Sequence, residues 1–225
     1  CYASLFTDRA ISYREHHGFG HLDVALSVGV QQMVRSDSAG AGVMFTLDTD
    51  SGFPRTVLID AAFGLGESVV AGLVEPDEYV IFKPLLDREE LTPIVSKTLG
   101  AKATKIIYRD TGTGGTPTET VETNADERAR FVLTDDEICQ LARWAVVIED
   151  HYGRAMDIEW AKDGTTGDLH IVQARPETVQ AHREATLFRS YHLTERGAVL
   201  VEGLAVGDAI ATGKVQRLDN AADID

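Results

Sequence analysis

The clearest helical pattern lies in the segment TDDEICQLARWAVVIEDHYG. Its capping box, Thr134 followed three residues later by Glu137, predicts the start of the helix. Gly153 predicts its end, because glycine commonly terminates a helix. A second helix is predicted over residues 2–16, ending near Gly18, from a similar spacing of apolar residues. The apolar stripe of the first helix consists of Ile138, Leu141, Ala142, Ala145 and Ile148.

Short apolar runs rich in Val, Ile and Phe predict strands elsewhere in the chain. Two of them, residues 90–97 and 103–110, are expected to form a pair of strands. The polar segment 110–124 is typical of an exposed loop or an edge hairpin. The remaining runs, bounded by Gly, Asp, Ser or Pro, predict the strands of one sheet: residues 22–34, 41–48, 56–64 and 77–83.

Residues 156–175, MDIEWAKDGTTGDLHIVQAR, predict two short strands joined by a glycine-containing turn. Residues two apart in a strand share a face, so the polar residues at alternate positions project together. Pairing the strands about the turn places Glu159 opposite Gln173, and Asp157 opposite Arg175. The hairpin therefore presents these four side chains as one polar patch. The apolar residues expected to face the core are Ile158, Trp160 and, on the second strand, Val172.

The polar patch has two interpretations. A Glu159 carboxylate beside a Gln173 amide oxygen offers two hard ligands that suit Mg²⁺ or Mn²⁺, completed by water and substrate phosphate. The planar guanidinium of Arg175 can hold a phosphoryl oxygen and stabilise charge that develops in its transfer. Alternatively, Asp157 and Arg175 form an ordinary cross-strand ion pair, and the other two side chains are solvated. The spacing of the four residues alone does not decide between these two interpretations.

Charge and cysteine content narrow the functional classes. Lys and Arg number 21 against 36 Asp and Glu, and the formal net charge of -15 repels nucleic-acid phosphates and anionic membranes. This negative charge is still compatible with nucleotide binding if a few basic residues and a divalent cation line the pocket. Two cysteines without a CxxC pair indicate neither a disulfide scaffold nor a zinc site, and fit a reducing, cytoplasmic setting. No run reaches the roughly 18–20 apolar residues of a membrane span. The termini, Cys1 and NAADID, suggest a piece of a longer protein.

Three other segments offer weaker candidate sites. AAFGLGESVVAG lacks the spacing of a dinucleotide fingerprint, so its glycines indicate a tight turn, with Glu67 as an open candidate for a ribose or metal contact. In SVGVQQMVRSD, the backbone can face an adenine edge while Met33 packs on the ring, although core packing explains Met33 equally well. Lys97 and Lys102 can meet phosphate, but a solvated basic edge is the simpler interpretation.

Several of these segments, in this order, resemble the nucleotide-binding region of the phosphoenolpyruvate synthase family. The similar blocks cover nearly the whole chain: SLFTDRAISYR, VGVQQMV, AGVMFT, GLGESVVAGLVEPDEY, IEDHYGRAMDIEWAKDG and IVQARPETVQ. Pyruvate phosphate dikinase and rifampicin phosphotransferase have similar blocks, but HYGRAMDIEWAKDG and QARPETVQ favour the synthase. The resemblance implies an α+β fold of the ATP-grasp type, with a mixed or antiparallel sheet and packed helices.

The resemblance also implies a domain organisation. Residues 1–180 would form the C-terminal part of the ATP-grasp nucleotide-binding domain, residues 181–202 a linker, and residues 203–225 the first strands of a swivelling phosphohistidine domain. The earlier ATP-grasp lobe, the rest of the phosphohistidine domain and the pyruvate-binding barrel would belong to the same polypeptide. The isolated chain is therefore expected to turn nothing over.

Carried over to this sequence, the family pattern puts Mg²⁺ ligands at Glu159 and Gln173, and a catalytic, transfer-assisting arginine at Arg175. The adenine hinge falls on residues 31–34, with the Gln32 C=O and the Val34 N–H as the expected edge contacts. The ATP-binding residues that the resemblance implies are Gln31, Gln32, Met33, Val34 and Arg175.

The implied reaction converts ATP, pyruvate and water to AMP, phosphoenolpyruvate and phosphate through a phosphohistidine. This chain would serve the transfer from ATP to the histidine, with Mg²⁺ as cofactor and neither nucleic acid nor membrane as partner. The oligomeric state is open, a homodimer being one option. Two alternatives stay open: another dikinase-like phosphotransferase, or a non-catalytic nucleotide-binding module. The joint presence of Glu159, Gln173 and Arg175 argues against the module.

Overall fold

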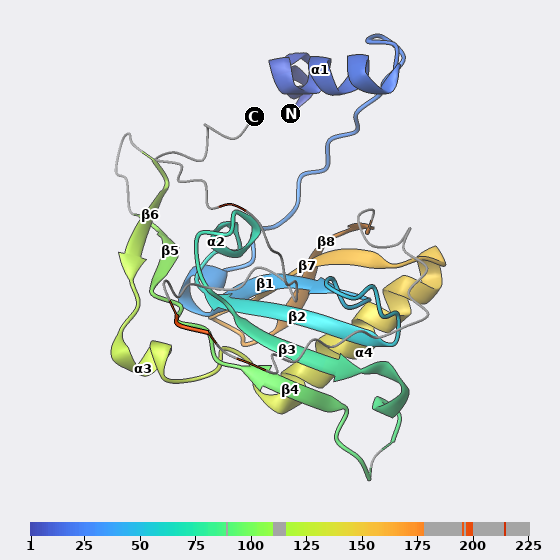
Figure 1. Ribbon diagram of the computed structural model, residues 1–225. Helices are drawn as coiled ribbons and strands as arrows, with labels where there is room; N and C mark the ends of the chain where they lie inside the picture. Colours follow the sequence, from blue (N-terminus) through green and yellow to red (C-terminus); the bar gives the residue numbers. More distant parts are fainter. Residues whose placement is uncertain (89, 110–115, 178–194, 196, 200–213, 215–225) are drawn as a thin grey trace. The chain divides into compact units, whose positions relative to one another are not determined.

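The computed structural model describes residues 1–88, 90–109, 116–177, 195, 197–199 and 214 (Figure 1). The chain divides into two compact units, Cys1–Val34 (unit 1) and Arg35–Asp225 (unit 2), and each is described by itself. The expected linker and the expected phosphohistidine strands fall almost entirely outside the described residues, so both stay predictions. Within the described part of the chain, no helix is both long and apolar enough to cross a membrane.

Unit 1 begins with two consecutive short helices, η1 (Tyr2–Phe6) and α1 (Asp8–His17), where the sequence pattern predicts one. The break lies at Thr7, whose backbone is extended and whose side chain accepts a hydrogen bond from the Ala10 N–H. A threonine oxygen that satisfies a free backbone donor favours a new helix start over continuation. Gly18, in the left-handed conformation with a φ of 71°, ends α1 as predicted.

The strand predicted over residues 22–34 is wrong. The described backbone there has no strand pairing. A strand needs a neighbour for its N–H and C=O groups, and unit 1 contains no strand among its described residues. Apolar side chains of this segment are therefore exposed within unit 1, Val30 completely so.

Unit 2 is built on a six-stranded sheet with the order β4-β3-β2-β1-β7-β8 (Figure 1). Neighbouring strands in this sheet are antiparallel throughout. The strands predicted over residues 41–48, 56–64 and 77–83 are confirmed, as are both strands of the hairpin. The six strands are β1 (Gly40–Phe45), β2 (Thr56–Phe63), β3 (Asp77–Phe82), β4 (Ile94–Thr98), β7 (Met156–Lys162) and β8 (Leu169–Pro176).

A separate two-stranded sheet consists of β5 (Thr104–Tyr108) and β6 (Thr118–Glu122). The two strands predicted over residues 90–97 and 103–110 are observed as β4 and β5, but they lie in different sheets, because β4 pairs with β3 and β5 pairs with β6. The chain changes direction between β4 and β5, where Lys102 has a left-handed φ of 41°. The edge-hairpin interpretation of residues 110–124 is confirmed for β6.

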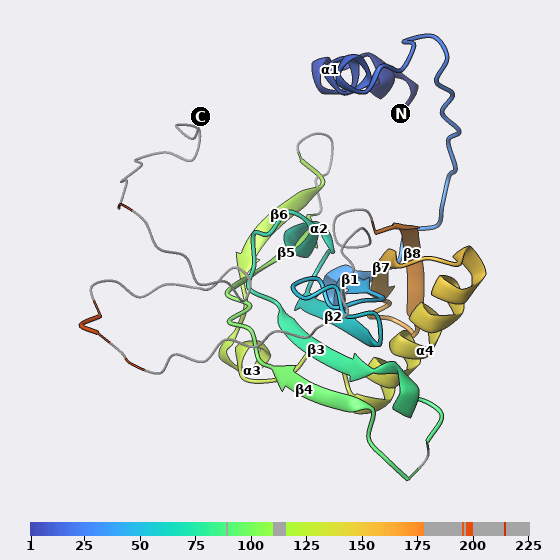
Figure 2. The ribbon, with the colours of Figure 1, turned by 45° about the vertical axis from the view of Figure 1, so that its right-hand side comes forward.

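Helix α4 (Asp135–Tyr152) covers one face of the six-stranded sheet (Figures 1 and 2). Both predicted capping-box hydrogen bonds of Thr134 and Glu137 are present, and Gly153 ends the helix with a φ of 64°. The predicted apolar stripe is buried against the sheet, apart from the partly buried Ile148. The short helices of unit 2 are η2 (Ser36–Ser38), α2 (Glu67–Val70), η3 (Lys83–Leu85) and α3 (Ala125–Arg128). Unit 2 is thus an α+β fold with an antiparallel sheet.

Candidate functional site

The hairpin of β7 and β8 adopts the register that the sequence predicts over Met156–Glu159. Glu159 lies opposite Gln173, and Asp157 lies opposite Arg175. Directly opposed residues of antiparallel strands project from the same face, so the four side chains share one face of the sheet. We call this the polar face. It lies opposite the face covered by α4, because Ile158 and Trp160, at the alternate positions, are buried in the core with α4.

A bulge modifies the second strand of this hairpin. The register shifts after Glu159, so that Trp160 pairs with Ile171, and Val172 is the extra residue. The prediction that Val172 faces the core is wrong. Among the described residues of β8, its neighbour Ile171 and Ala174 pack against the hydrophobic core instead. The bulge restores the apolar alternation of β8 while leaving Gln173 opposite Glu159.

An ion pair joins two of the four polar residues. Arg175 donates from Nε and Nη2 to one carboxylate oxygen of Asp157, at 2.8 and 2.6 Å. The Asp157 side chain is only 12% exposed, whereas that of Arg175 is 62% exposed. The buried carboxylate of Asp157 therefore orients the guanidinium of Arg175. The N–H groups of Arg175 that do not contact Asp157 are available to another anion.

Glu159 and Gln173 offer an oxygen donor set for a metal ion. Glu159 is half-buried in the interior strand β7, next to the edge of the sheet, and Gln173 is exposed on the edge strand β8. A carboxylate and an amide oxygen on neighbouring strands suit Mg²⁺, which takes hard oxygen ligands and usually keeps water or phosphate in its other positions. The residues present therefore fit the predicted cation.

The polar face carries two further acidic residues that the sequence reasoning missed. Strand pairing places Asp60 of β2 opposite Val43 of β1, which in turn lies opposite Glu159. Glu78 of β3 lies opposite Asp60. Burial, with a contribution from the charge of Glu78, raises the pKa of Asp60 to about 7. The alternation in TVLIDAAF signals that Asp60 shares a face with Leu58 and Ala62, but not which strand lies beside it.

The glycine-containing segment after β2 forms a tight turn, as predicted. Gly64 has a φ of 88°, and a Cβ there would lie 3.0 Å from the Lys105 side chain and closer still to the Ile106 carbonyl oxygen. Glycine is therefore required by both the backbone conformation and the close approach of β5. Glu67 is exposed in the first turn of α2, immediately after this turn.

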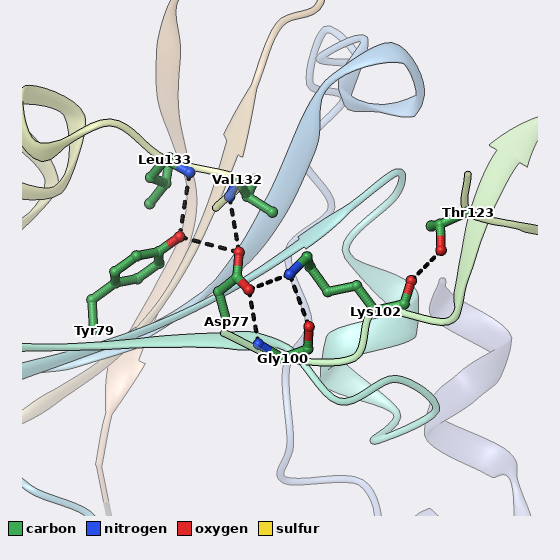
Figure 3. Close-up of polar contacts among 7 residues, drawn as sticks. All are labelled: Asp77, Tyr79, Gly100, Lys102, Thr123, Val132 and Leu133. Atoms are coloured by element: carbon green, nitrogen blue, oxygen red, sulfur yellow. Dashed lines mark hydrogen bonds and ion pairs between the residues drawn. The ribbon is translucent and has the colours of Figure 1, made fainter. Parts of the chain in front are cut away.

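The two lysines considered for phosphate binding make structural contacts instead. Lys97 donates to Asp135 at 2.7 Å, at the start of α4. The expectation of a solvated basic edge is wrong for Lys102, which is fully buried and paired with the equally buried Asp77 (Figure 3). Its ammonium also donates to the Gly100 carbonyl oxygen at 2.9 Å.

The expected adenine hinge, residues 31–34, belongs to unit 1, and the hairpin belongs to unit 2. The structure brings together the predicted metal and phosphate residues. The hinge stays a prediction.

Comparison with known proteins agrees with the resemblance read from the sequence. Residues 1–192 match the family model described as "Pyruvate phosphate dikinase, AMP/ATP-binding domain". The chain is 56% identical to the phosphoenolpyruvate synthase of Synechocystis sp. and 53% identical to that of Pseudomonas aeruginosa, with all of this chain aligned in each case. It is 48% identical to the Escherichia coli phosphoenolpyruvate synthase over 99% of its length. The chain spans 28% of the length of each of these relatives. This chain therefore belongs to the family of pyruvate phosphate dikinase AMP/ATP-binding domains.

Proposed function

We propose that this chain is an ATP-binding lobe of a phosphoenolpyruvate synthase, of the ATP-grasp type, and that it serves the transfer from ATP to a histidine. The observation that carries the proposal is the strand register that sets Glu159 opposite Gln173 and Asp157 opposite Arg175 on one face. Membership of an AMP/ATP-binding domain family supports the nucleotide. The relatives' name supports phosphoenolpyruvate as the product of the whole enzyme. We propose pyruvate and water as the other substrates, with AMP and phosphate as the other products.

In this proposal Glu159 and Gln173 hold Mg²⁺ against the phosphates of ATP. A bound Mg²⁺ would neutralise charge on the phosphate oxygens during the transfer. The half-buried Glu159 supplies the negative charge of the site from the interior strand β7, whose position is fixed by neighbours on both sides. Gln173 supplies a neutral oxygen at the exposed edge strand, where water and phosphate have access.

Arg175 binds the transferring phosphoryl group in the same scheme. Its two hydrogen bonds to Asp157 use part of the guanidinium fork, and its exposed N–H groups can donate to a phosphoryl oxygen. Because Asp157 holds the guanidinium in one orientation, less conformational freedom is lost when the phosphate binds.

A pyruvate phosphate dikinase is the second candidate, favoured by the description of the matching family model. The two reactions differ in the second phosphoryl acceptor, which is water in the synthase and inorganic phosphate in the dikinase. The nucleotide-binding lobe serves the same step in both. We prefer the synthase because the relatives with the identities given above carry that name.

The test is Glu159→Ala in the full-length protein. Formation of phosphohistidine from Mg-ATP should fall well over tenfold, because one of two protein ligands of the cation is lost, whereas the fold should be retained since the side chain is not in the core. Phosphohistidine is measured by acid-labile, base-stable labelling, and retention of the fold by circular dichroism. Release of phosphate from Mg-ATP and pyruvate, with no inorganic phosphate added, would distinguish the synthase from the dikinase.

Glu122→Ala is the matched control. Glu122 is also a strand glutamate, but it lies in β6 on the separate two-stranded sheet, and its side chain is 88% exposed. This variant should phosphorylate at the wild-type rate. Near-normal phosphorylation by Glu159→Ala would reduce the polar patch to an ordinary cross-strand ion pair beside two solvated side chains.

A further inference from the structure

Thr46, the residue that follows β1, extends the pairing of β1 with β7 by one position. Its N–H donates to the Met156 carbonyl oxygen at 3.0 Å. In the return direction, the Met156 N–H donates to the side-chain hydroxyl oxygen of Thr46 at 2.8 Å. In an ordinary antiparallel pair the second acceptor would be a backbone carbonyl oxygen. A side-chain oxygen therefore takes the place of a backbone oxygen at the start of β7.

The carbonyl oxygen of Thr46 accepts from a lysine instead. The Lys83 ammonium, at the start of η3, donates to this oxygen at 2.5 Å. It also donates to the Pro54 carbonyl oxygen at 2.7 Å and to the Glu149 carboxylate of α4 at 2.6 Å. Three acceptors match the three N–H groups of an ammonium. Lys83 thus fixes the Thr46 backbone from three directions, with a side chain that is only 13% exposed.

Burial makes the Thr46 hydroxyl hard to replace. Thr46 and Met156 are both completely buried. A buried backbone N–H that loses its acceptor keeps its desolvation penalty, because water does not reach it. Removal of the hydroxyl therefore forces the start of β7 to shift until the Met156 N–H finds another acceptor.

The start of β7 leads directly to the polar face. Met156 precedes Asp157, which lies opposite Phe45 of β1 and orients the Arg175 guanidinium. All of these residues belong to unit 2. We propose that the Thr46 hydroxyl is a positioning group for Arg175, acting through the Met156 backbone and the Asp157 carboxylate. This inference rests on the function proposed above, in which Arg175 binds the transferring phosphoryl group.

The test begins with Thr46→Val in the full-length protein, which removes the hydroxyl and nearly keeps the shape of the side chain. The single-turnover rate of phosphohistidine formation at saturating Mg-ATP should fall about tenfold, because a small displacement of a group that contacts the reacting atoms is costly. The Kd of Mg-ATP should not change, because the pairing of β7 with both β1 and β8 keeps Glu159 opposite Gln173. Equal losses of rate and affinity would indicate a merely structural role and contradict the proposal.

Thr46→Ser and Thr46→Cys form a matched pair that differs in one atom. The serine keeps the oxygen acceptor and should phosphorylate at the wild-type rate, whereas the weakly accepting sulfur of cysteine should lower the rate in the direction of Thr46→Val. This pair gives an answer even where Thr46→Val does not fold. Equal rates for the serine and cysteine variants would remove the role of the hydroxyl.

A double-mutant cycle separates this inference from the proposed function. If Thr46 acts through Arg175, adding Thr46→Val to Arg175→Ala should leave the rate of Arg175→Ala unchanged. The same fold loss from Thr46→Val in both backgrounds would overturn the inference and leave the role of Arg175 intact. An unchanged rate in Arg175→Ala alone would instead refute the proposed role of Arg175, and this inference with it.

Discussion

Two aspartate ion pairs of unit 2 use similar chemistry in opposite surroundings. In the buried pair, Asp77 and Lys102, both side chains are completely buried. In the open pair, Asp157 and Arg175, the carboxylate is mostly covered but the guanidinium is largely exposed. Both are formed by an aspartate in a strand of the same sheet. They differ in how many donors and acceptors are left over for a ligand.

The carboxylate of the buried pair has its hydrogen-bonding capacity filled by the protein (Figure 3). The Asp77 carboxylate accepts from the backbone N–H groups of Gly100, at 2.9 Å, and Val132, at 2.8 Å, in addition to the Lys102 ammonium. The Tyr79 hydroxyl donates to the same carboxylate at 3.3 Å. The pair thus joins the start of β3, the β4 to β5 connection and the segment before α4. A saturated, buried network of this kind stabilises one arrangement of the chain.

The open pair is ordered on one side only. Asp157 orients the guanidinium, but the exposed N–H groups of Arg175 face away from the core and can meet a phosphate. The exposure of the cation, more than the residue types, therefore distinguishes a structural ion pair from a candidate ligand site. The following substitutions test this distinction, from the largest expected effect to the smallest.

Lys102→Met should have the largest effect on stability. It leaves the Asp77 carboxylate buried without its cation, and breaking a buried pair in this way costs about 3–5 kcal/mol of unfolding free energy. Urea denaturation measures the change, and hydrogen exchange of the Gly100 and Val132 amides locates it. Lys97→Met, at the more exposed pair with Asp135, should cost about 1 kcal/mol or less. Equal costs for the two variants would contradict the structural role of the buried pair.

Arg175→Ala should show the reverse behaviour. Phosphohistidine formation in the full-length protein should fall about 100-fold or more, because the charge-stabilising arginine is lost. The unfolding free energy should change by about 1 kcal/mol or less, as for other exposed ion pairs. Arg109→Ala, which removes an exposed arginine 4.0 Å from Glu119 on the separate sheet, is the matched control and should leave the rate unchanged. A large loss of stability with an unchanged rate would make the open pair structural.

Asp60→Asn tests a carboxyl group whose surroundings lie between these two extremes. The folded-state pKa of about 7 exceeds the usual 3.8, so the folded state binds this proton more tightly than the unfolded state does. The contribution of Asp60 to the free energy of unfolding is therefore fully present below pH 4 and is lost as the pH rises to about 7.

The asparagine stays neutral, so Asp60→Asn should gain stability relative to the wild type between pH 4 and pH 8. The relative gain should be about 2 kcal/mol, which is less than the full conversion of the pKa shift because the side chain is only partly buried. Thermal unfolding of both proteins across this pH range measures the gain. A difference between them that is independent of pH would show that Asp60 titrates as an ordinary surface aspartate.

Local signals in the sequence were sufficient for most elements of unit 2. The Thr134 capping box, the glycine at 153 and the alternation in residues 156–175 act over a few residues, and each led to the observed helix or hairpin. The alternation predicted a hairpin whose register is observed over Met156–Glu159. Next to the turn the pairing is shifted by one residue, and the bulge at Val172, which the sequence pattern did not signal, brings Gln173 opposite Glu159.

Tertiary structure decided what depends on residues far apart in the chain. Residues 22–34 have the apolar content of a strand but no strand beside them in unit 1, and β5 pairs with β6 rather than with β4. Contacts between distant segments include the buried ion pair of Lys102 with Asp77 and the hydrogen bond from the Arg35 N–H to Asp163. The position of Asp60 on the polar face likewise depends on the pairing of β2 with β1. Hydrophobic periodicity reports which face of an element is buried, whereas the partner across that face is selected only when the whole sheet packs.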